Sequence, residues 1–500
     1  MIPEPFFAAS GSRWHETSGR GRRPRPCSVA AALGALAVAS AVAGQSFSVV
    51  AQVTPTINDP EDYCGWSIAI SGDVIVAGSP TSDVGVPWVP GDEGTVAIIE
   101  RSGAGWAETA SFFGPDPRPS DSLGWSVDVS GDRMIVGAFG RDIAGAGNRG
   151  EAYVYRRDAS GWTIEATLLA PDGLALENFG YAVAIDGDRA AVGAPIAANG
   201  PLGQCGAVHI FERDVAGIWN HVSKLQHAQP ASGDWFGALL VLKGDRLFVH
   251  ARLDDLPGAT DAGSVRVFSR GAAGAWAEEA TIVAPAPAAS DRFGNGFDGV
   301  GDTLVVGMRL ADRPGATDSG KAFVYRRTPG KKSASWTLVQ ELVAPDSAAG
   351  DSFGTAIACD GDHLYVTARL DDVGGRADEG SMWVFRRDAS GAYEPEAQVF
   401  SPIEQSIQWF GFSVAAEDGV VAVGAPFANI AGDFNIGAAI VLELAPPSPD
   451  LDGDGTVGGS DLAVLLAQWG GGGPADLDGD GTVGAADLAI LLGAWGPTGG

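Results

Sequence analysis

The chain has 500 residues, of which 45% are apolar and 19% charged, with 72 glycines and 30 prolines. Its formal net charge of −30 argues against a nucleic-acid-binding surface, which requires clustered Lys and Arg. Apolar and aromatic residues are too abundant for a disordered chain, and the Gly and Pro content favours many short strands joined by turns.

The first 44 residues have the pattern of an export signal. Arginines between Arg20 and Arg25 precede the apolar stretch SVAAALGALAVASAVA, which ends in small residues at Ala41-Val42-Ala43. This stretch is shorter than the about 20 apolar residues that a transmembrane helix needs. We therefore expect cleavage of residues 1–44 and a mature protein without a transmembrane segment, secreted or held at the cell surface. An uncleaved anchor is the alternative.

An aromatic-Gly step, or a variant of it, recurs seven times between residues 64 and 411. The intervals between its glycines are 59, 56, 57, 57, 60 and 57 residues, and these glycines are Gly65, Gly124, Gly180, Gly237, Gly294, Gly354 and Gly411. In the third copy, FGYAVAIDGDRAAVGAP reads as two strands around a Gly-Asp turn, and GAVHIFER and a Trp-led segment follow. Each copy therefore predicts four antiparallel strands. Because one such sheet cannot bury both faces, radial stacking into an all-β, seven-bladed β-propeller over residues 45–445 is expected.

The seventh copy ends at GAAIVLELA without a fourth strand. The N-terminal stretch FSVVAQVTPTINDPEDYCG is similar to the fourth strand and following step of an earlier copy, TIEATLLAPDGLALENFG. Residues 46–55 are therefore predicted to supply the outer strand of the last blade and to remove the open seam. The aromatic residues that start the fourth strands are expected to fill the space between blades; they are Trp106, Trp162, Trp219, Trp276, Trp336 and Tyr393. Arginines that end the third strands are expected to be exposed.

The unit resembles the FG-GAP repeat of integrin α-subunit propellers and bacterial secreted proteins, most fully in FGYAVAIDGDRAAVGAP and FGFSVAAEDGVVAVGAP. In other copies the second half drifts to VGAFG, VHARL, VGMRL and VTARL. The resemblance implies an extracellular binding or adhesion scaffold with a protein or glycan ligand. Integrin-type copies often carry a calcium loop where this chain has only a Gly-Asp turn, so no calcium is expected in the blades.

The loops after the second strands of copies four to six are rich in carboxylates. Asp254, Asp312 and Asp371 lead to the hypothesis of an acidic patch for a cation or a basic partner. The alternative is a set of solvated turns in which each Asp bonds its own backbone. No Ser-His-Asp, His-Glu-x-x-His or cysteine-pair pattern is present, so a non-enzymatic protein is expected, although plentiful carboxylates leave a glycosidase pair open.

The C-terminus carries one motif twice, DLDGDGTVGGSDLAVLLAQWG and DLDGDGTVGAADLAILLGAWG. Acidic residues at loop positions 1, 3, 5 and 12, a backbone carbonyl at 7 and Gly at 6 form the oxygen-rich pattern that Ca²⁺ prefers. The predicted ligands of two Ca²⁺ ions are Asp450, Asp452, Asp454, Thr456 and Asp461 in the first loop, and Asp476, Asp478, Asp480, Thr482 and Asp487 in the second. A short apolar helix with a Gly stop follows each loop, and the two units can bury their leucines together.

This doubled loop and helix, over residues 450–496, resembles the EF-hand-like type I dockerin, which binds cohesin modules. The Pro-rich segment 446–449 reads as a stiff spacer. The resemblance implies a cohesin-like or cell-surface partner, with recognition positions held here by Gly459, Ser460, Ala485 and Ala486. Three functions stay open: a binding or adhesion scaffold, a polysaccharide-binding or polysaccharide-degrading component of a dockerin–cohesin complex, and a structural cell-surface protein.

Overall fold

The structure is a computed structural model that describes residues 39–41, 47–57, 59–83, 91–103, 105–330, 334–444, 448–452, 454–471, 475–477 and 482–497. Of the predicted signal peptide, these residues include only strand β1 (Ala39–Ala41), which pairs with β26 in the sixth blade. The rest of that segment lies outside the described residues, so its cleavage stays a prediction. No helix in the described part of the chain is long and apolar enough to cross a membrane.

The body of the protein consists of seven four-stranded antiparallel blades, as the sequence predicted. Blade one contains β3 (Ser67–Ser71), β4 (Val74–Ser79), β5 (Thr95–Ser102) and β6 (Gly105–Phe112). Blade two contains β7 (Leu123–Ser130), β8 (Arg133–Ala138), β9 (Glu151–Asp158) and β10 (Gly161–Leu168). Blade three contains β11 (Ala182–Asp186), β12 (Arg189–Ala194), β13 (Ala207–Arg213) and β14 (Trp219–Leu225). Blade four contains β15 (Phe236–Lys243), β16 (Arg246–Ala251), β17 (Ser264–Arg270) and β18 (Trp276–Ile282). Blade five contains β19 (Phe297–Val300), β20 (Thr303–Met308), β21 (Lys321–Thr328) and β22 (Ser335–Leu342). Blade six contains β23 (Phe353–Asp360), β24 (His363–Ala368), β25 (Ser381–Arg387) and β26 (Tyr393–Phe400). The seventh contains β27 (Ser413–Glu417), β28 (Val420–Ala425), β29 (Ala438–Leu444) and β2 (Phe47–Val53).

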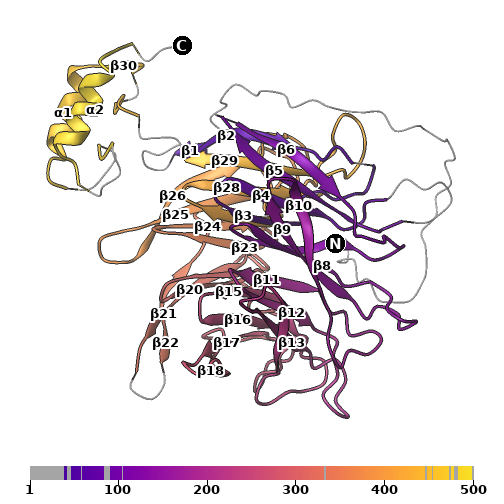
Figure 1. The fold of residues 1–500 in the computed structure, drawn as a ribbon. Coiled ribbons are helices and arrows are strands. Elements are labelled where there is room, and N and C mark those ends of the chain that lie inside the picture. The colour runs from indigo at the N-terminus through magenta and orange to yellow at the C-terminus, as the bar shows by residue number, and fades with distance from the viewer. Residues whose placement is uncertain are drawn as a thin grey trace.

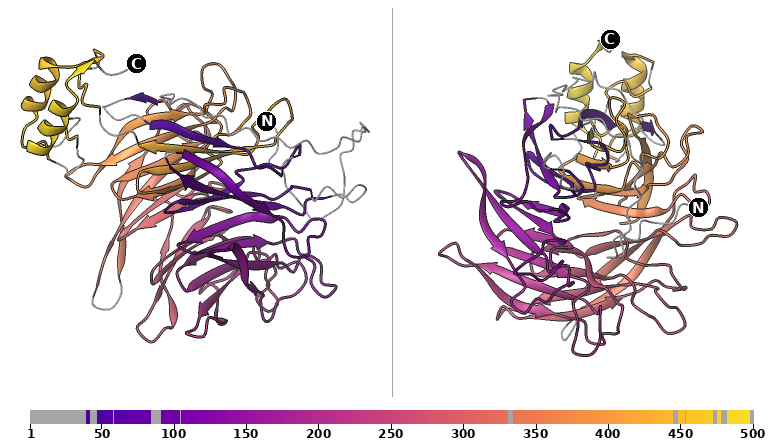
Figure 2. Two further views of the ribbon diagram at one scale, coloured as in Figure 1. Left: turned by 45° about the horizontal axis from the view of Figure 1, so that its top comes forward. Right: turned by 90° about the vertical axis from the view of Figure 1, so that its right-hand side faces the viewer.

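The blades, many of whose strands are labelled in Figure 1, form a closed ring, and their innermost strands line a central channel. Each innermost strand contacts the innermost strand of the next blade, and β27 of the last blade contacts β3 of the first. In the right-hand view of Figure 2 the chain colours pass round the ring, so that indigo and orange segments meet. Apolar clusters fill the spaces between neighbouring blades, and the cluster between blades six and seven is centred on residues such as Phe410 and Ile440.

The ring is closed by the pairing of its two ends. Strand β2 lies antiparallel to β29, with Phe47 opposite Leu444 and Val53 opposite Ala439. Its side chains alternate between buried and half-buried, which is the pattern of a strand with one face on a core. Phe47 is fully buried and meets Tyr365 of the sixth blade edge-on, with ring centroids 6.2 Å apart. The outer strand of the last blade therefore comes from the N-terminal side of the ring, where the sequence predicted it.

Two glycines of each full repeat bring neighbouring blades into backbone contact. In the aromatic-Gly step, Gly180 has φ +91° and its N–H donates to the Gly193 carbonyl of the same blade, 3.0 Å away. A Cβ on Gly193 would lie 2.1 Å from the Gly237 carbonyl oxygen of the next blade. A side chain at Gly193 would therefore clash with the backbone of the next blade, so the two glycine positions set how closely these blades approach each other.

The arginines at the ends of the third strands are not simply exposed, contrary to the sequence-based expectation. In five of the blade junctions among the described residues, the Arg binds a Glu of the preceding blade, at 2.7–3.0 Å: Arg101–Glu443, Arg157–Glu100, Arg213–Glu165, Arg270–Glu212 and Arg327–Glu279. At three of them the first tryptophan of the fourth strand also donates its Nε1–H to that Glu, at 2.9–3.0 Å. These Glu–Arg–Trp contacts, one of which crosses the closing junction through Glu443, join blade to blade.

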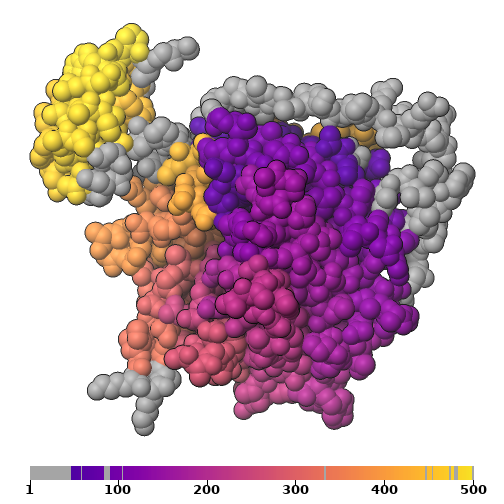
Figure 3. All heavy atoms as spheres, in the orientation of Figure 1, coloured from indigo at the N-terminus to yellow at the C-terminus, as the bar shows by residue number. Residues whose placement is uncertain are grey.

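The tail is a small separate unit, drawn in yellow where it projects from the propeller in Figure 3. It contains α1 (Gly459–Ala467), α2 (Ala485–Gly493) and the short paired strands β30 (Thr456–Val457) and β31 (Gly496–Pro497). Leu465 and Leu491, at equivalent positions of the two helices, are completely buried in one cluster with Val457 and Val483. Each half of the duplicated motif thus supplies part of a common core.

Candidate functional site

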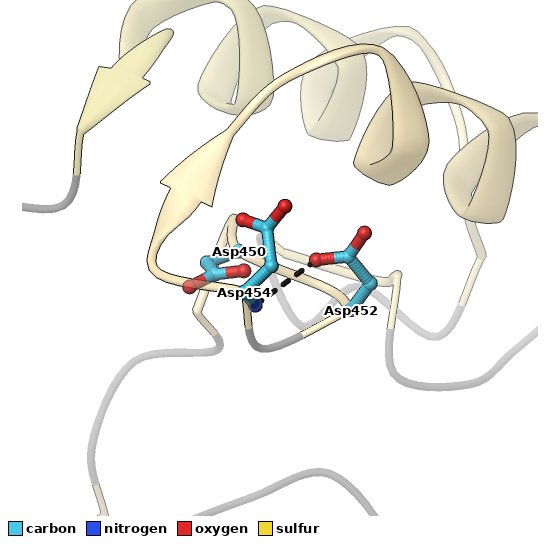
Figure 4. Close-up of side chains that lie close together, drawn as sticks. All are labelled: Asp450, Asp452 and Asp454. Atoms are coloured by element: carbon cyan, nitrogen blue, oxygen red, sulfur yellow. Dashed lines mark hydrogen bonds between the residues drawn. The ribbon is translucent and has the colours of Figure 1, made fainter.

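The first acidic loop of the tail brings three carboxylates together. Oxygens of Asp450, Asp452 and Asp454 all lie within 4.8 Å of one another, and these residues are half-buried or exposed. Figure 4 shows the three side chains beneath the start of the following helix, with the Asp454 N–H donating to the Asp452 carboxylate at 3.1 Å. A further backbone donor, the N–H of Gly455, reaches Asp450 at 2.9 Å. The loop therefore holds one oxygen of each carboxylate in a single small group.

Asp461, at loop position 12, organises the same loop from within. Its side chain is completely buried, and its carboxylate accepts N–H groups of Leu451, Asp452 and Gly458 at 2.7, 3.1 and 2.6 Å. These hydrogen bonds, that from Gly458 foremost, lower the pKa of Asp461 below its ordinary value. A carboxylate offers about four lone-pair sites, so three N–H donors leave it capacity for a cation. Asp461 is outside the three-carboxylate group and fastens the loop to the N-terminus of α1.

The second loop repeats the described part of this arrangement. Asp487 is 1% exposed and accepts the N–H groups of Leu477 and Gly484, both at 2.6 Å. Asp476 is also buried, at 4% exposure. The predicted ligands Asp478 and Asp480 lie outside the described residues. The equivalence of Asp461 and Asp487 shows that the duplication in sequence is also a duplication in local structure.

The donors in the tail are the oxygen ligands that suit Ca²⁺. The first loop offers three converging carboxylates, and the Thr456 carbonyl at position 7 follows on β30. Hard cations such as Ca²⁺ take six to eight oxygens, with water filling the remaining places. No nitrogen or sulfur ligand stands in the described part of either loop. The residues present therefore fit calcium.

The predicted partner-binding positions of the tail are exposed at the starts of the helices. Gly459, Ser460, Ala485 and Ala486 all lie on the surface. The larger exposed side chains lie elsewhere, in two equivalent pairs within the segments that were predicted as apolar helices. Leu466 and Trp469 are 54% and 48% exposed, and Leu492 and Trp495 are 51% and 50% exposed. Leu466 and Leu492 each follow a buried leucine by one residue, about 100° round the helix, and Trp469 and Trp495 lie beyond the ends of α1 and α2.

The structure does not assemble Asp254, Asp312 and Asp371 into an exposed acidic patch. Asp254 is 5% exposed and bonds the Ser264 hydroxyl and the Arg266 guanidinium; Asp371 is 9% exposed and bonds Ser381. Asp312 is exposed and accepts the backbone N–H of Asp318 at 3.0 Å, six residues along its own loop. Asp312 also occupies a different repeat position, since Ala311 is the equivalent of Asp254. Asp312 thus fits the alternative interpretation of a solvated turn, whereas Asp254 and Asp371 are buried and bond side chains of the following strand.

Comparison with known proteins identifies the repeats. Four segments match the model of the FG-GAP repeat family, at residues 106–155, 162–211, 276–325 and 336–385. A solved structure of a protein from Lactobacillus plantarum is similar, with 16% sequence identity and a TM-score of 0.44, over 70% of this chain and 87% of that one. No curated protein matches the chain in sequence. The body is a seven-bladed propeller in which these four segments match the FG-GAP repeat.

Proposed function

We propose that this FG-GAP propeller is a secreted, non-enzymatic binding or adhesion scaffold, and that its dockerin-like tail folds around two Ca²⁺ ions and anchors it to a partner. The observation that carries the proposal is the first tail loop, in which oxygens of three carboxylates lie within 4.8 Å of one another while the buried Asp461 fastens the loop to the following helix. In the second loop the buried Asp487 makes the equivalent contact to its helix. Ion binding at such loops contributes to folding as well as to occupancy. The propeller then presents the ligand-binding surface.

Anchoring is supported by the exposed apolar side chains of the tail. Leu466 and Trp469 on one unit and Leu492 and Trp495 on the other each leave about half of their surface in water. Aromatic residues are enriched at the energetic centres of protein interfaces. Because calcium holds the loops that precede both helices, these pairs should dock on a cohesin-like or cell-surface protein only when calcium is bound.

Calorimetric titration of metal-stripped full-length protein with CaCl₂ tests the tail. Two ions should bind, and Asp450→Ala or Asp476→Ala should each remove one of them, because each variant deletes the position 1 carboxylate of one loop. Asp312→Ala, which removes an exposed loop carboxylate of the propeller, is the control and should leave both ions bound.

Failure of the unmodified protein to bind Ca²⁺, or two ions retained after loss of both Asp450 and Asp476, would show that the tail is not a calcium module. Capture of the full chain on an immobilised cohesin module, with and without EGTA, addresses the anchoring step separately. Retention that EGTA does not reverse contradicts calcium-dependent docking.

A further inference from the structure

One end of the central channel has two chemically different sides. A cavity of about 280 Å³ opens there and joins the channel, which encloses about 640 Å³ between the innermost strands. Two positions of the repeat supply most of its lining: the residue after the signature glycine, and the residue that follows the second strand. The residues at these positions that line the cavity are Trp66, Trp125, Tyr181, Ala238, Asn295, Phe412, Arg252, Arg309 and Arg369.

Blades seven, one, two and three form the aromatic side. The residue after the signature glycine is Phe412, Trp66, Trp125 and Tyr181 in these blades. Their rings form a continuous arc, with centroids of Phe412 and Trp66 4.7 Å apart, Trp66 and Trp125 4.8 Å, and Trp125 and Tyr181 5.4 Å. All four line the cavity. They thus differ from the tryptophans of the fourth strands, which pack between blades.

Blades four, five and six form the cationic side. In these blades the aromatic residue is replaced by Ala238, Asn295 or Thr355, and the GAP motif at the end of the second strand drifts to HAR, GMR and TAR. The drift places Arg252, Arg309 and Arg369 at the cavity. Arg309 and Arg369 are only 4% and 9% exposed. Three arginines from successive blades therefore face one site in a protein whose net charge is −30.

The arginines and the aromatic residues meet at the edge of the sixth blade. The Arg369 guanidinium carbon lies 4.7 Å from the ring centroid of Trp409 and 5.6 Å from that of Phe412. Both distances are those of a cation–π contact, which holds the guanidinium against the aromatic residues. The cationic and aromatic sides are thus parts of one surface.

A buried histidine adds a polar group at the same cavity. His250 stands where the GAP motif has its glycine, lines the cavity and is 3% exposed. Its Nε2 has no hydrogen-bond partner among the described residues. Burial, and then the charge of Arg252, lowers the pKa of His250 to about 3, so the ring is neutral at ordinary pH. A buried polar atom without a partner costs free energy unless a ligand satisfies it.

We propose that this channel mouth binds an acidic sugar, a pyranose ring that carries a carboxylate. The apolar face of the ring stacks on the aromatic arc, the guanidinium groups take the carboxylate, and His250 bonds a hydroxyl group. The small cavity suits a terminal or isolated sugar unit. The inference rests on the proposed role of the propeller as the ligand-binding part and is independent of calcium in the tail.

Binding of uronic-acid disaccharides to the full chain tests this assignment through titration calorimetry and Trp fluorescence. Digalacturonate or diglucuronate should bind at least about tenfold more tightly than its carboxyl-reduced neutral counterpart, since a hydrogen-bonded charge pair is worth at least that factor. Arg309→Gln and Trp125→Ala should each weaken binding about tenfold or more. Arg156→Gln, at an arginine that is 51% exposed and does not line the cavity, should leave it unchanged.

Ligand controls keep the test independent of variant folding. Equal binding of the acidic and neutral disaccharides by the unmodified protein, binding of neither, or tighter binding of benzoate or inorganic phosphate would overturn the assignment. EGTA separates the two proposals: uronate binding should survive chelation. If the protein binds two Ca²⁺ ions but no uronate, only the ligand assignment is wrong. If it binds uronate but no Ca²⁺, only the proposal for the tail is wrong.

Discussion

At the scale of single residues, the repeated glycines are determined by contacts between blades. Gly124 has φ +83°, and a Cβ there would lie 2.5 Å from the Thr95 carbonyl oxygen. Gly145, in an exposed loop of the second blade, also has φ +83° but has nothing within 4 Å of the same position. The two glycines share one backbone conformation and differ only in crowding. Comparing them therefore distinguishes the cost of a left-handed backbone from the cost of a steric clash.

Gly124→Ala should therefore destabilise the propeller more than Gly145→Ala. The left-handed backbone conformation alone costs a side-chain-bearing residue about 1–2 kcal/mol, and overpacking adds about 1–3 kcal/mol at Gly124. Equilibrium urea denaturation of the two variants measures the difference. Equal losses of stability would mean that the blades can separate to admit a methyl group, and that close backbone approach does not explain the motif.

Residue roles were only partly predictable from sequence. The spacing of Asp450, Asp452 and Asp454 predicted their convergence, because a short loop around a glycine leaves few other arrangements. Asp254 and Asp371 belong to equally acidic loops but are buried and bonded to Ser264 and Ser381 of the neighbouring strands. Periodicity gives no sign of this difference, since it depends on which strand-end hydroxyl faces the loop.

At the scale of strands, the Glu–Arg–Trp contacts explain why Trp and Arg recur at the edges of the blades. Glu279 has a side chain that is 6% exposed and accepts two guanidinium hydrogen bonds from Arg327 and one from Trp336 of the next blade, at 2.8–2.9 Å. The hydrogen bond from Arg327 is the main reason that the pKa of Glu279 is lowered. One carboxylate thus holds two strands of its neighbour.

Glu279→Ala is expected to cost about 2–4 kcal/mol of unfolding free energy, because it leaves a largely buried guanidinium and an indole N–H without their acceptor. Glu341→Ala is the matched control: Glu341 pairs with Lys321 at 2.9 Å but its side chain is 44% exposed. Removal of that pair should cost no more than about 1 kcal/mol. Chemical denaturation measures the loss of stability in both variants. If Glu279→Ala costs as little as Glu341→Ala, the Glu279 contacts contribute no more than an exposed ion pair.

The strands themselves followed from alternation and turn residues, but the contacts between blades did not. The acceptor Glu lies on the third strand at Glu443 and Glu212 and on the fourth at Glu165 and Glu279, so no fixed spacing marks it in the sequence. The same limit applies to the channel mouth. The drift from GAP to HAR, GMR and TAR is visible in the sequence, whereas the cavity shared with the aromatic residues follows from the ring arrangement.

At the scale of the whole molecule, the ring depends on a pairing between residues about 400 positions apart. Strand β2 covers the edge of β29 and inserts Phe47 into the cluster between blades six and seven. The sequence was sufficient to predict this closure, because the last copy lacks a fourth strand and the N-terminal stretch is similar to one.

Phe47→Ala should lower stability by about 3–5 kcal/mol, since it empties a fully buried aromatic site. Gln52→Ala, at a half-buried position of the same strand, should change stability by less than about 1 kcal/mol. Thermal unfolding followed by circular dichroism and Trp fluorescence distinguishes them. The Phe47→Ala transition should move to lower temperature while remaining single; unchanged melting, or loss of the seventh blade alone, would contradict a jointly stabilised ring.

This pairing also sets an order of events during biosynthesis. The ribosome makes β2 before any other strand of the ring, yet the partner of β2 is the last propeller strand to emerge. An apolar segment that includes Phe47 must therefore stay soluble and unpaired until about 400 further residues have been made. The earliest segment of the nascent propeller is thus the one most exposed to misassembly, and it is where a chaperone would protect the chain most.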